Sequence, residues 1–387
     1  MDPIVLQARV PSASAAQVLD ARDLRVIDLR TASEHAEDHL PGAVNVRLFD
    51  DVGRALIGTL YRRESPERAF GEARELARAR ISGLVEEIGR ASDWRPPRAD
   101  LERELERWTS GGIEAFDTAL EAEPVDRLPE DPVVLHCWRG GLRSRSVVAF
   151  VRALGLERAV LLAGGYKAYR RAVIAGLAGW EAPPAFVLRG LTGVGKTLVL
   201  REIERLRPGW TVDLEALAGH RSSILGMVGL VPRSQKAFET GLYARIRASF
   251  PGGVVVFEGE SRKVGDAIIP DRVWCALHGG ANLELVAAPE RRVEVLVEDY
   301  LEHPASRDEL RRQLPFIERR LGARWEGELV AMLDAGRERE LAALLLERYY
   351  DPLYRHSEGR RSYAASFDSS DPAGAAERIA AWISTRG

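Results

Sequence analysis

Short runs of apolar residues, bounded by turn-forming residues, recur along the chain and predict buried strands. They cover residues 24–29, 39–46, 133–135, 160–162, 185–188, 211–214, 253–257 and 283–286. Residues 39–46 include a turn before their strand, and we expect 24–29 to open the first domain. Helical patterns separate the runs, and alternating strands and helices are typical of parallel α/β sheets.

Two longer stretches have a helical pattern. Residues 65–123 are rich in Glu, Arg, Ala and Leu and are interrupted at Pro96-Pro97, so we expect a helical insertion over about 50–130. Residues 307–348 are also mostly helical in pattern, and 179–184 resembles a linker. We therefore expect a first domain at 1–180 and a second domain at 181–387 with a helical C-terminal part.

Composition narrows the class of protein. The 387 residues suit two domains, 29% are charged, and no apolar run reaches a membrane-spanning length. The N-terminal residues lack a basic segment followed by an apolar one, so we expect no secretion signal. Two cysteines cannot form a secreted-type disulfide framework, which favours a reduced, cytoplasmic protein. Because the net charge is −3, a nucleic-acid partner would need a local basic patch.

The first chemical motif is His136-Cys137-Trp138-Arg139-Gly140-Gly141-Leu142-Arg143-Ser144. A strand ends and a helix begins around Cys137, so backbone N–H groups and the helix N-terminus favour a thiolate. We expect Cys137, Arg143 and Arg139 to be catalytic, with Arg143 best placed to close the loop. The alternative is a buried structural cysteine. His136 is as readily a core histidine as a base, and Cys275, in an apolar run, is expected in the core.

The second motif, Gly190-x-x-x-x-Gly195-Lys196-Thr197, fits a phosphate-binding P-loop between a strand and a helix. Backbone N–H groups would cradle phosphates, Lys196 would reach the terminal ones, and Thr197 would hold Mg²⁺. The expected phosphate-binding residues are Gly190, Thr192, Gly193, Val194, Gly195, Lys196, Thr197 and, as a clamp, Arg291. Glu258 and Glu260 follow a later strand and would orient Mg²⁺ or water; a solvated strand end is the alternative for Glu258.

The first domain resembles the rhodanese family, in residues 26–30, 39–45, the Cys137 loop and Leu162-Ala163-Gly164-Gly165-Tyr166. Five residues separate Cys137 from Arg143, whereas sulfur-transferring rhodaneses usually have four. The longer loop is similar to that of rhodanese-fold phosphatases and suits a larger oxyanion, such as phosphate or selenophosphate. The resemblance implies a rhodanese-like parallel-sheet domain with a helical insertion, followed by a P-loop NTPase-like α/β domain.

A rhodanese-like domain followed by a P-loop domain is the arrangement of the tRNA 2-selenouridine synthases, and the chain resembles this family over nearly its whole length. Further similar segments are 213–221, 234–239 and 258–265. The resemblance implies that wobble 2-thiouridine of tRNA is geranylated with geranyl diphosphate, and that selenium from selenophosphate then replaces the S-geranyl group. The P-loop would hold the diphosphate, and Cys137 would carry or position selenium. No tightly bound cofactor is expected, and Mg²⁺ is a candidate ion; no metal ligand is assigned with certainty.

A tRNA partner directs attention to residues 136–171, which hold eight Lys or Arg residues and one acidic residue. The candidate tRNA contacts are Trp138, Arg145, Lys167, Arg170 and Arg171. A solvated arginine-rich face is the alternative for this stretch. For Trp138 the alternative is a rim aromatic packed on the helical insertion, and it is slightly favoured over a stacking platform for the base. Residues 224–231 would line a groove for a prenyl chain or form a buried helix.

Two other functions compete with this one. The first is an ATP-dependent kinase or sulfurtransferase with a rhodanese module, for which ATP turnover would depend on Lys196. The second is a nucleotide-gated persulfide sensor that binds a protein partner, for which Cys137 would be an inert thiol. We expect no membrane association.

Overall fold

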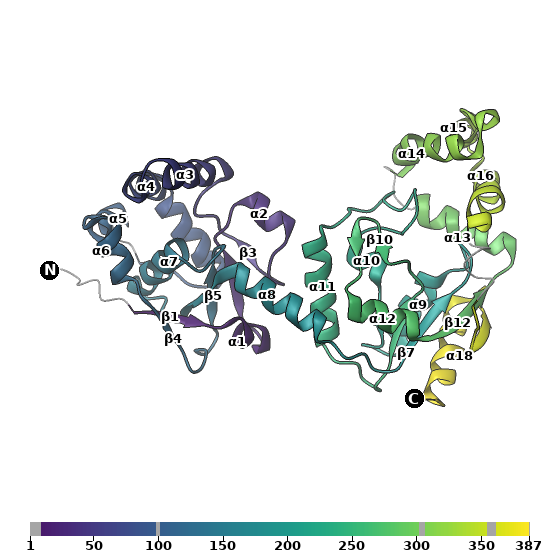
Figure 1. Cartoon of the computed structure of the whole chain (residues 1–387), viewed down its shortest axis with the longest axis horizontal. Coiled ribbons are helices and arrows are strands. Elements are labelled where there is room, and N and C mark those ends of the chain that lie inside the picture. The colour runs from purple at the N-terminus through teal and green to yellow at the C-terminus, as the bar shows by residue number, and fades with distance from the viewer. Residues whose placement is uncertain (1–8, 98–100, 302–305, 354–360, 387) are drawn as a thin grey trace. The chain divides into compact units, whose positions relative to one another are not determined.

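The computed structural model describes residues 9–97, 101–301, 306–353 and 361–386. Its contacts divide the chain into two compact units, Met1–Ala175 and Gly176–Gly387 (Figure 1). Each unit has its own parallel sheet, so the predicted α/β class is confirmed.

The sheet of the first unit has six strands, and every neighbouring pair is parallel. Their spatial order is β3 (Val44–Asn45), β2 (Arg25–Asp28), β5 (Val133–His136), β6 (Ala159–Leu162), β1 (Val10–Ala13) and β4 (Ala122–Pro124). The expectation that 24–29 opens the domain is wrong, because β1 precedes it. Pro11 and Ser12 interrupt the apolar run in this strand, so the sequence pattern does not predict it, although Ser12 is buried.

Eight helices lie among the described residues from Ala15 to Ala178. They are α1 (Ala15–Asp20), α2 (Ala32–Glu37), α3 (Asp51–Arg63), α4 (Pro66–Ser92), α5 (Leu101–Thr109), α6 (Gly112–Ala119), α7 (Leu142–Ala153) and α8 (Gly165–Ala178). The helices α3 to α6 lie in the chain between β3 and β4. Ser65 caps α4, whose Leu84 and Ile88 are buried in one core with Val148 of α7. The helical stretch thus packs as part of the domain.

The second sheet has five parallel strands. Their order is β13 (Ala365–Asp368), β12 (Ala281–Val286), β7 (Ala185–Arg189), β9 (Val255–Glu258) and β8 (Thr211–Val212). The strand predicted at 211–214 ends early because Asp213 caps the next helix. The edge strand β13 was not predicted, since its residues alternate between half-buried and exposed and form no apolar run.

Helices cover this sheet, and a helical group lies at one side of the unit (Figure 1). The elements are α9 (Lys196–Leu206), α10 (Leu214–Ala218), α11 (Gln235–Arg247), α12 (Asp271–Gly279), α13 (Pro289–Leu301), α14 (Ser306–Leu321), α15 (Glu328–Asp334), α16 (Glu338–Leu345) and α18 (Pro372–Ser384), with a β10–β11 hairpin (Lys263–Val264, Ala267–Ile268). The side chains of α13 to α16 share one apolar cluster. No helix in the described ranges is long and apolar enough to cross a membrane.

Candidate functional site

The first loop joins β5 to α7 and buries the sulfur of Cys137. Gly141 caps α7 without a side-chain hydrogen bond, so the first backbone N–H groups of the helix face the loop. The Cys137 side chain is 2% exposed, and its Sγ lies 3.1 Å from the Ser144 hydroxyl oxygen. Ser144, in the first turn of α7, was not predicted from the sequence to act on Cys137. Its position directly after Arg143 could have indicated this role.

The surroundings of Cys137 favour its thiolate. Burial raises the pKa of the thiol, but four opposing influences outweigh it and leave the pKa lowered overall. They are the charge of Arg143, the Ser144 hydroxyl and hydrogen bonds from the backbone N–H groups of Arg139 and Gly141. An anion-stabilising shell of this kind suits a nucleophile or an oxyanion site better than an inert structural thiol.

Glycines allow the Cys137 loop to pack tightly against the start of α8. Gly165 has a φ of +57°, and a Cβ there would lie 2.4 Å from the Cys137 carbonyl oxygen. Gly140 has a φ of +63°, and its Cβ would lie 2.8 Å from the Gly164 nitrogen. The Tyr166 N–H donates to the Cys137 carbonyl at 2.9 Å. The Gly-Gly pair that opens α8 therefore holds the cysteine loop in place.

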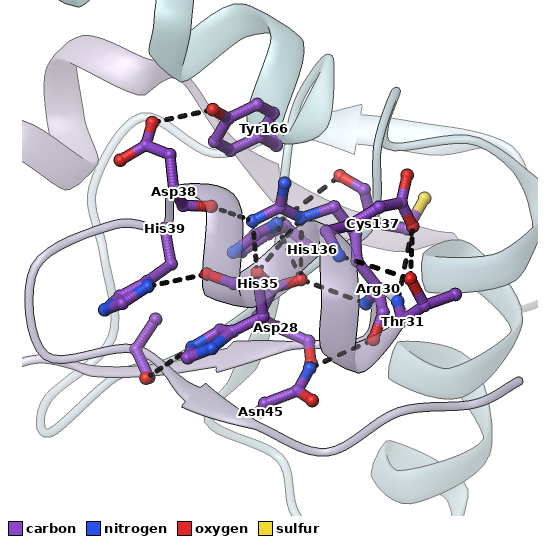
Figure 2. A network of polar contacts seen from close by, with 12 residues as sticks. Asp28, Arg30, Thr31, His35, Asp38, His39, Asn45, His136, Cys137 and Tyr166 are labelled. Atoms are coloured by element: carbon purple, nitrogen blue, oxygen red, sulfur yellow. Dashed lines mark hydrogen bonds and ion pairs between the residues drawn. The ribbon is translucent and has the colours of Figure 1, made fainter. Parts of the chain in front are cut away.

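A buried polar network supports the same loop (Figure 2). Arg30 donates to both carboxylate oxygens of Asp28, and both side chains are 1% exposed or less. The Arg30 guanidinium lies 3.8 Å from the centre of the Tyr166 ring, and the Tyr166 hydroxyl donates to Asp38 at 2.6 Å. Because Tyr166 also contacts the Cys137 backbone, the network links the Asp28 strand to the cysteine loop.

His136 belongs to the core. It is fully buried, its Nδ1 lies 3.7 Å from Asp28, and burial lowers its pKa to about 4. The imidazole is thus neutral at physiological pH, and among the described residues its Nε2 has no hydrogen-bond partner. The core interpretation of His136 is favoured over a general base.

The predicted tRNA contacts fall into two groups. Arg145 pairs with Asp117 and donates to the Leu120 carbonyl, and Arg170 is 9% exposed and lies 3.8 Å from Asp38. Both guanidinium groups thus have internal partners. Lys167 and Arg171 are exposed, one turn apart on α8. The Trp138 ring packs against that of Tyr166 of α8, with 5.3 Å between their centroids.

The second loop joins β7 to α9 as the motif predicts. Gly190, Gly193 and Gly195 all have positive φ, and a Cβ at Gly190 would lie 2.4 Å from the Leu285 carbonyl. The Lys196 ammonium donates to the carbonyls of Gly190 and Leu191 at 3.2 and 3.4 Å. Two side chains from other parts of the unit donate hydrogen bonds to the loop carbonyls. Arg292 donates to the Thr192 carbonyl at 2.8 Å, and Ser369 donates to the Val194 carbonyl at 2.7 Å.

Three carboxylates converge beside this loop. Oxygens of Glu215, Glu258 and Glu260 all lie within 4.8 Å of one another. The parallel register places Glu258 opposite Leu188, two residues before the loop, and Glu258 accepts from the Thr197 hydroxyl at 2.9 Å. At 1% exposed, Glu258 is not the solvated strand end that was the alternative. Glu215 was missed in the sequence, although its place just after β8 in a parallel sheet was a usable signal.

Burial raises the pKa of all three carboxyl groups. Burial and then the charge of Glu260 raise the pKa of Glu215 to about 9. Burial also raises the pKa of Glu258 and of Glu260. The Glu258 Oε1 atom is buried with no hydrogen-bond partner among the described residues. Carboxylate oxygens beside a P-loop threonine are the ligand types that Mg²⁺ prefers, so these residues fit a divalent cation.

Arg291, the predicted phosphate clamp, lies on α13 within 3.3 and 3.5 Å of Glu294 and Glu298. Its neighbour Arg292 is the one that contacts the P-loop, and Asp351 holds both its terminal nitrogens at 3.1 and 2.5 Å. A phosphate contact by Arg291 stays a prediction. Arg292 was missed because adjacent arginines on a helix are equivalent in sequence, and only packing distinguishes them.

Two other expectations are corrected. Cys275 is exposed, because Val273 and Leu277 occupy the buried face of α12 and Cys275 lies between them on the other face. In the run 224–231, residues 224–229 form turns and no buried helix is present; Leu225 and Val228 are buried, but Met227 and Val231 are exposed.

Comparison with known proteins finds a matching domain family for each of the two units. The tRNA 2-selenouridine synthase AAA domain matches residues 183–386, and the rhodanese-like domain matches residues 12–172. A tRNA 2-selenouridine synthase of Chromohalobacter salexigens is 30% identical over 88% of this chain and 90% of its own length. Those of Alcanivorax borkumensis and Nitrosomonas europaea are 29% and 30% identical, over 90% and 72% of this chain and 93% and 64% of their own lengths. The chain therefore belongs to the tRNA 2-selenouridine synthase family.

Proposed function

We propose that the protein is a tRNA-modifying transferase that converts wobble 2-thiouridine to 2-selenouridine through S-geranyl-2-thiouridine. The observation that carries the proposal is the presence, in one chain, of a thiolate-stabilising oxyanion loop and a P-loop lined by carboxylates. Relatives that span most of the chain are named tRNA 2-selenouridine synthases, which supports the selenouridine product.

The P-loop unit is proposed to perform the first step. The sulfur of 2-thiouridine attacks C1 of geranyl diphosphate, the C–O bond breaks and pyrophosphate leaves. The loop N–H groups and Lys196 stabilise the charge on the leaving diphosphate. Glu215, Glu258, Glu260 and Thr197 would hold Mg²⁺, which supplies further charge neutralisation when bound.

The rhodanese-like unit is proposed to perform the second step. Alkylation makes the sulfur a better leaving group, so selenium of selenophosphate can displace it at C2 as geranylthiolate. Water then cleaves the P–Se bond and releases phosphate. Arg143 and the loop N–H groups bind the oxyanion, and Cys137 positions the selenium of selenophosphate for this attack. Trp138, Lys167 and Arg171 lie around this loop and are proposed to receive the anticodon region of tRNA.

Nucleoside mass spectrometry tests the proposal. Protein is incubated with 2-thiouridine tRNA, geranyl diphosphate, selenophosphate and Mg²⁺, and we expect selenouridine, with S-geranyl-2-thiouridine accumulating when selenophosphate is omitted. Cys137→Ser should spare geranylation and abolish selenation, whereas Lys196→Ala should reduce geranylation by about 100-fold or more. Equal loss of both steps in Cys137→Ser contradicts the division of labour. Unchanged 2-thiouridine together with Lys196-dependent ATP turnover would support a kinase-like enzyme instead.

A further inference from the structure

An apolar pocket lies within the helical group of the second unit. Its walls include Leu296 and Tyr300 of α13, Leu314 of α14, and Leu341, Ala342 and Leu345 of α16. All six side chains are at most 9% exposed. Figure 1 shows these helices together at one side of the unit. The pocket therefore lies among packed, buried side chains of this helical group.

The pocket adjoins the P-loop. A Cβ built at Gly193 would lie 2.7 Å from Leu296 Cδ1, so this wall residue packs directly on the loop. Arg292, one turn earlier on α13, donates to the Thr192 carbonyl of the same loop at 2.8 Å. One helix thus forms both a side of the phosphate-binding loop and a wall of the pocket.

The wall offers little to a polar ligand. Among the described residues that line the pocket, Glu338 is the only charged one, and it is paired with Arg307. The Tyr300 hydroxyl lies 3.2 Å from the Ser223 hydroxyl. An anion site beside a hydrocarbon-lined pocket matches a ligand with an anionic head and an apolar chain.

We propose that this pocket receives the hydrocarbon chain of a prenyl diphosphate whose diphosphate is bound by the P-loop. The inference rests on the proposed function and adds the site that selects chain length. The pocket is narrow, about 40 Å³, so wall side chains must rotate to admit a chain. Its depth then limits the number of isoprene units. Of the run 224–231, expected from the sequence to line such a groove, Leu225 alone is on this wall.

Two adjacent alanines of α16 give a matched test. Ala342 lines the pocket and is 6% exposed, whereas Ala343 is exposed to solvent. Binding of geranyl diphosphate and of inorganic pyrophosphate is measured by calorimetry with Mg²⁺ for the parent, Ala342→Phe and Ala343→Phe. In the parent, geranyl diphosphate should bind on the order of 100-fold tighter than pyrophosphate, because its chain is buried. Ala342→Phe should remove most of this preference without changing pyrophosphate affinity, and Ala343→Phe should retain it.

The outcomes separate the inference from the proposed function. If the parent binds neither ligand, the P-loop role fails and the inference fails with it. If Ala342→Phe keeps the parent preference, the pocket does not hold the chain, although the function stands. A second variant, Leu345→Ala, enlarges the pocket and should shift the preference from geranyl towards farnesyl diphosphate by about ten-fold. If Ala342→Phe does not fold, an unchanged preference in Leu345→Ala overturns the proposal.

Discussion

At the scale of single residues, the reactivity of both loops depends on the groups that surround the reactive side chains. Cys137 is a candidate nucleophile because Arg143, Ser144 and two backbone N–H groups outweigh the effect of burial. Glu215 stays protonated near neutral pH because it is buried beside Glu260. Each of these two environments gives a measurable prediction.

Ser144→Ala should raise the pKa of Cys137, because it removes a hydrogen bond to the thiolate. The thiolate absorbance near 240 nm, followed against pH in a Cys275→Ser background, measures the pKa of the remaining thiol. Alkylation by iodoacetamide near pH 7 should slow on the order of ten-fold, since a hydrogen bond to a charged group contributes about 1.5–3 kcal/mol. Ser146→Ala is the matched control, because the Ser146 hydroxyl donates to the Arg143 carbonyl. Equal pKa values in the two variants would exclude Ser144 from thiolate stabilisation.

The pKa of Glu215, raised from 4.5 to about 9, makes the cation-free protein less stable as pH rises through that window. The folded state keeps a proton that the unfolded chain has released, so protonation favours folding at the lower pH. Glu215→Gln should therefore raise the unfolding temperature at pH 8 by at least about 2 °C. Mg²⁺ should stabilise the parent more strongly as pH rises, because it binds the deprotonated carboxylate.

Differential scanning calorimetry at pH 6 and pH 8, with and without Mg²⁺, checks this expectation. Glu202→Gln, at a surface ion pair with Arg205, is the control. A parent unfolding temperature that is independent of Mg²⁺ at both pH values would argue against a cation site at the three carboxylates.

At the scale of elements, the sequence predicted most strands, including the edge strands β3 and β8, and missed β1, β4 and β13. The strands β2, β5, β6, β7 and β9 carry apolar runs because nearly all of their residues are buried. The strand β4 is exposed along its length, and β13 is half exposed, so neither leaves such a run. The glycines of both loops identified them in the sequence. The residues that hydrogen-bond to the loop carbonyls could not be identified in this way, because Tyr166, Arg292 and Ser369 approach from distant parts of the chain.

Gly165→Ala should destabilise the first unit by about 2 kcal/mol or more. An alanine would adopt a left-handed backbone and place its Cβ against the Cys137 carbonyl. Gly141→Ala should retain the parent stability, because nothing lies within 4 Å of its added Cβ and its φ is −87°. Chemical denaturation of both variants measures the difference; similar midpoints would show that the Gly165 contact does not constrain the loop.

At the scale of the whole molecule, the proposed tRNA binding by an acidic chain requires local positive charge. The net charge is −3, yet Lys167 and Arg171 are exposed on the helix that holds the cysteine loop. The sequence of residues 136–171 could not show which of its cations are available to a ligand. Arg145 and Arg170 have the same side chain as Arg171 but lie in internal ion pairs.

Arg171→Ala should reduce the dependence of tRNA affinity on salt, with the slope of log K against log salt falling by about 1. Arg145→Ala should leave that slope unchanged, since its guanidinium is occupied by Asp117 and the Leu120 carbonyl. Filter binding at several salt concentrations measures both variants. The opposite ranking would place the tRNA backbone near Asp117 and not along α8.

The unequal exposure of the two cysteines has a practical consequence for thiol chemistry. Cys137 is 2% exposed, whereas Cys275 is exposed. A bulky maleimide dye will label Cys275 first and report nothing about the active loop, while hydrogen peroxide is small enough to reach both sulfurs. We therefore expect inactivation by peroxide but not by a large maleimide, and bulky thiol-specific labels should leave Cys137 unmodified.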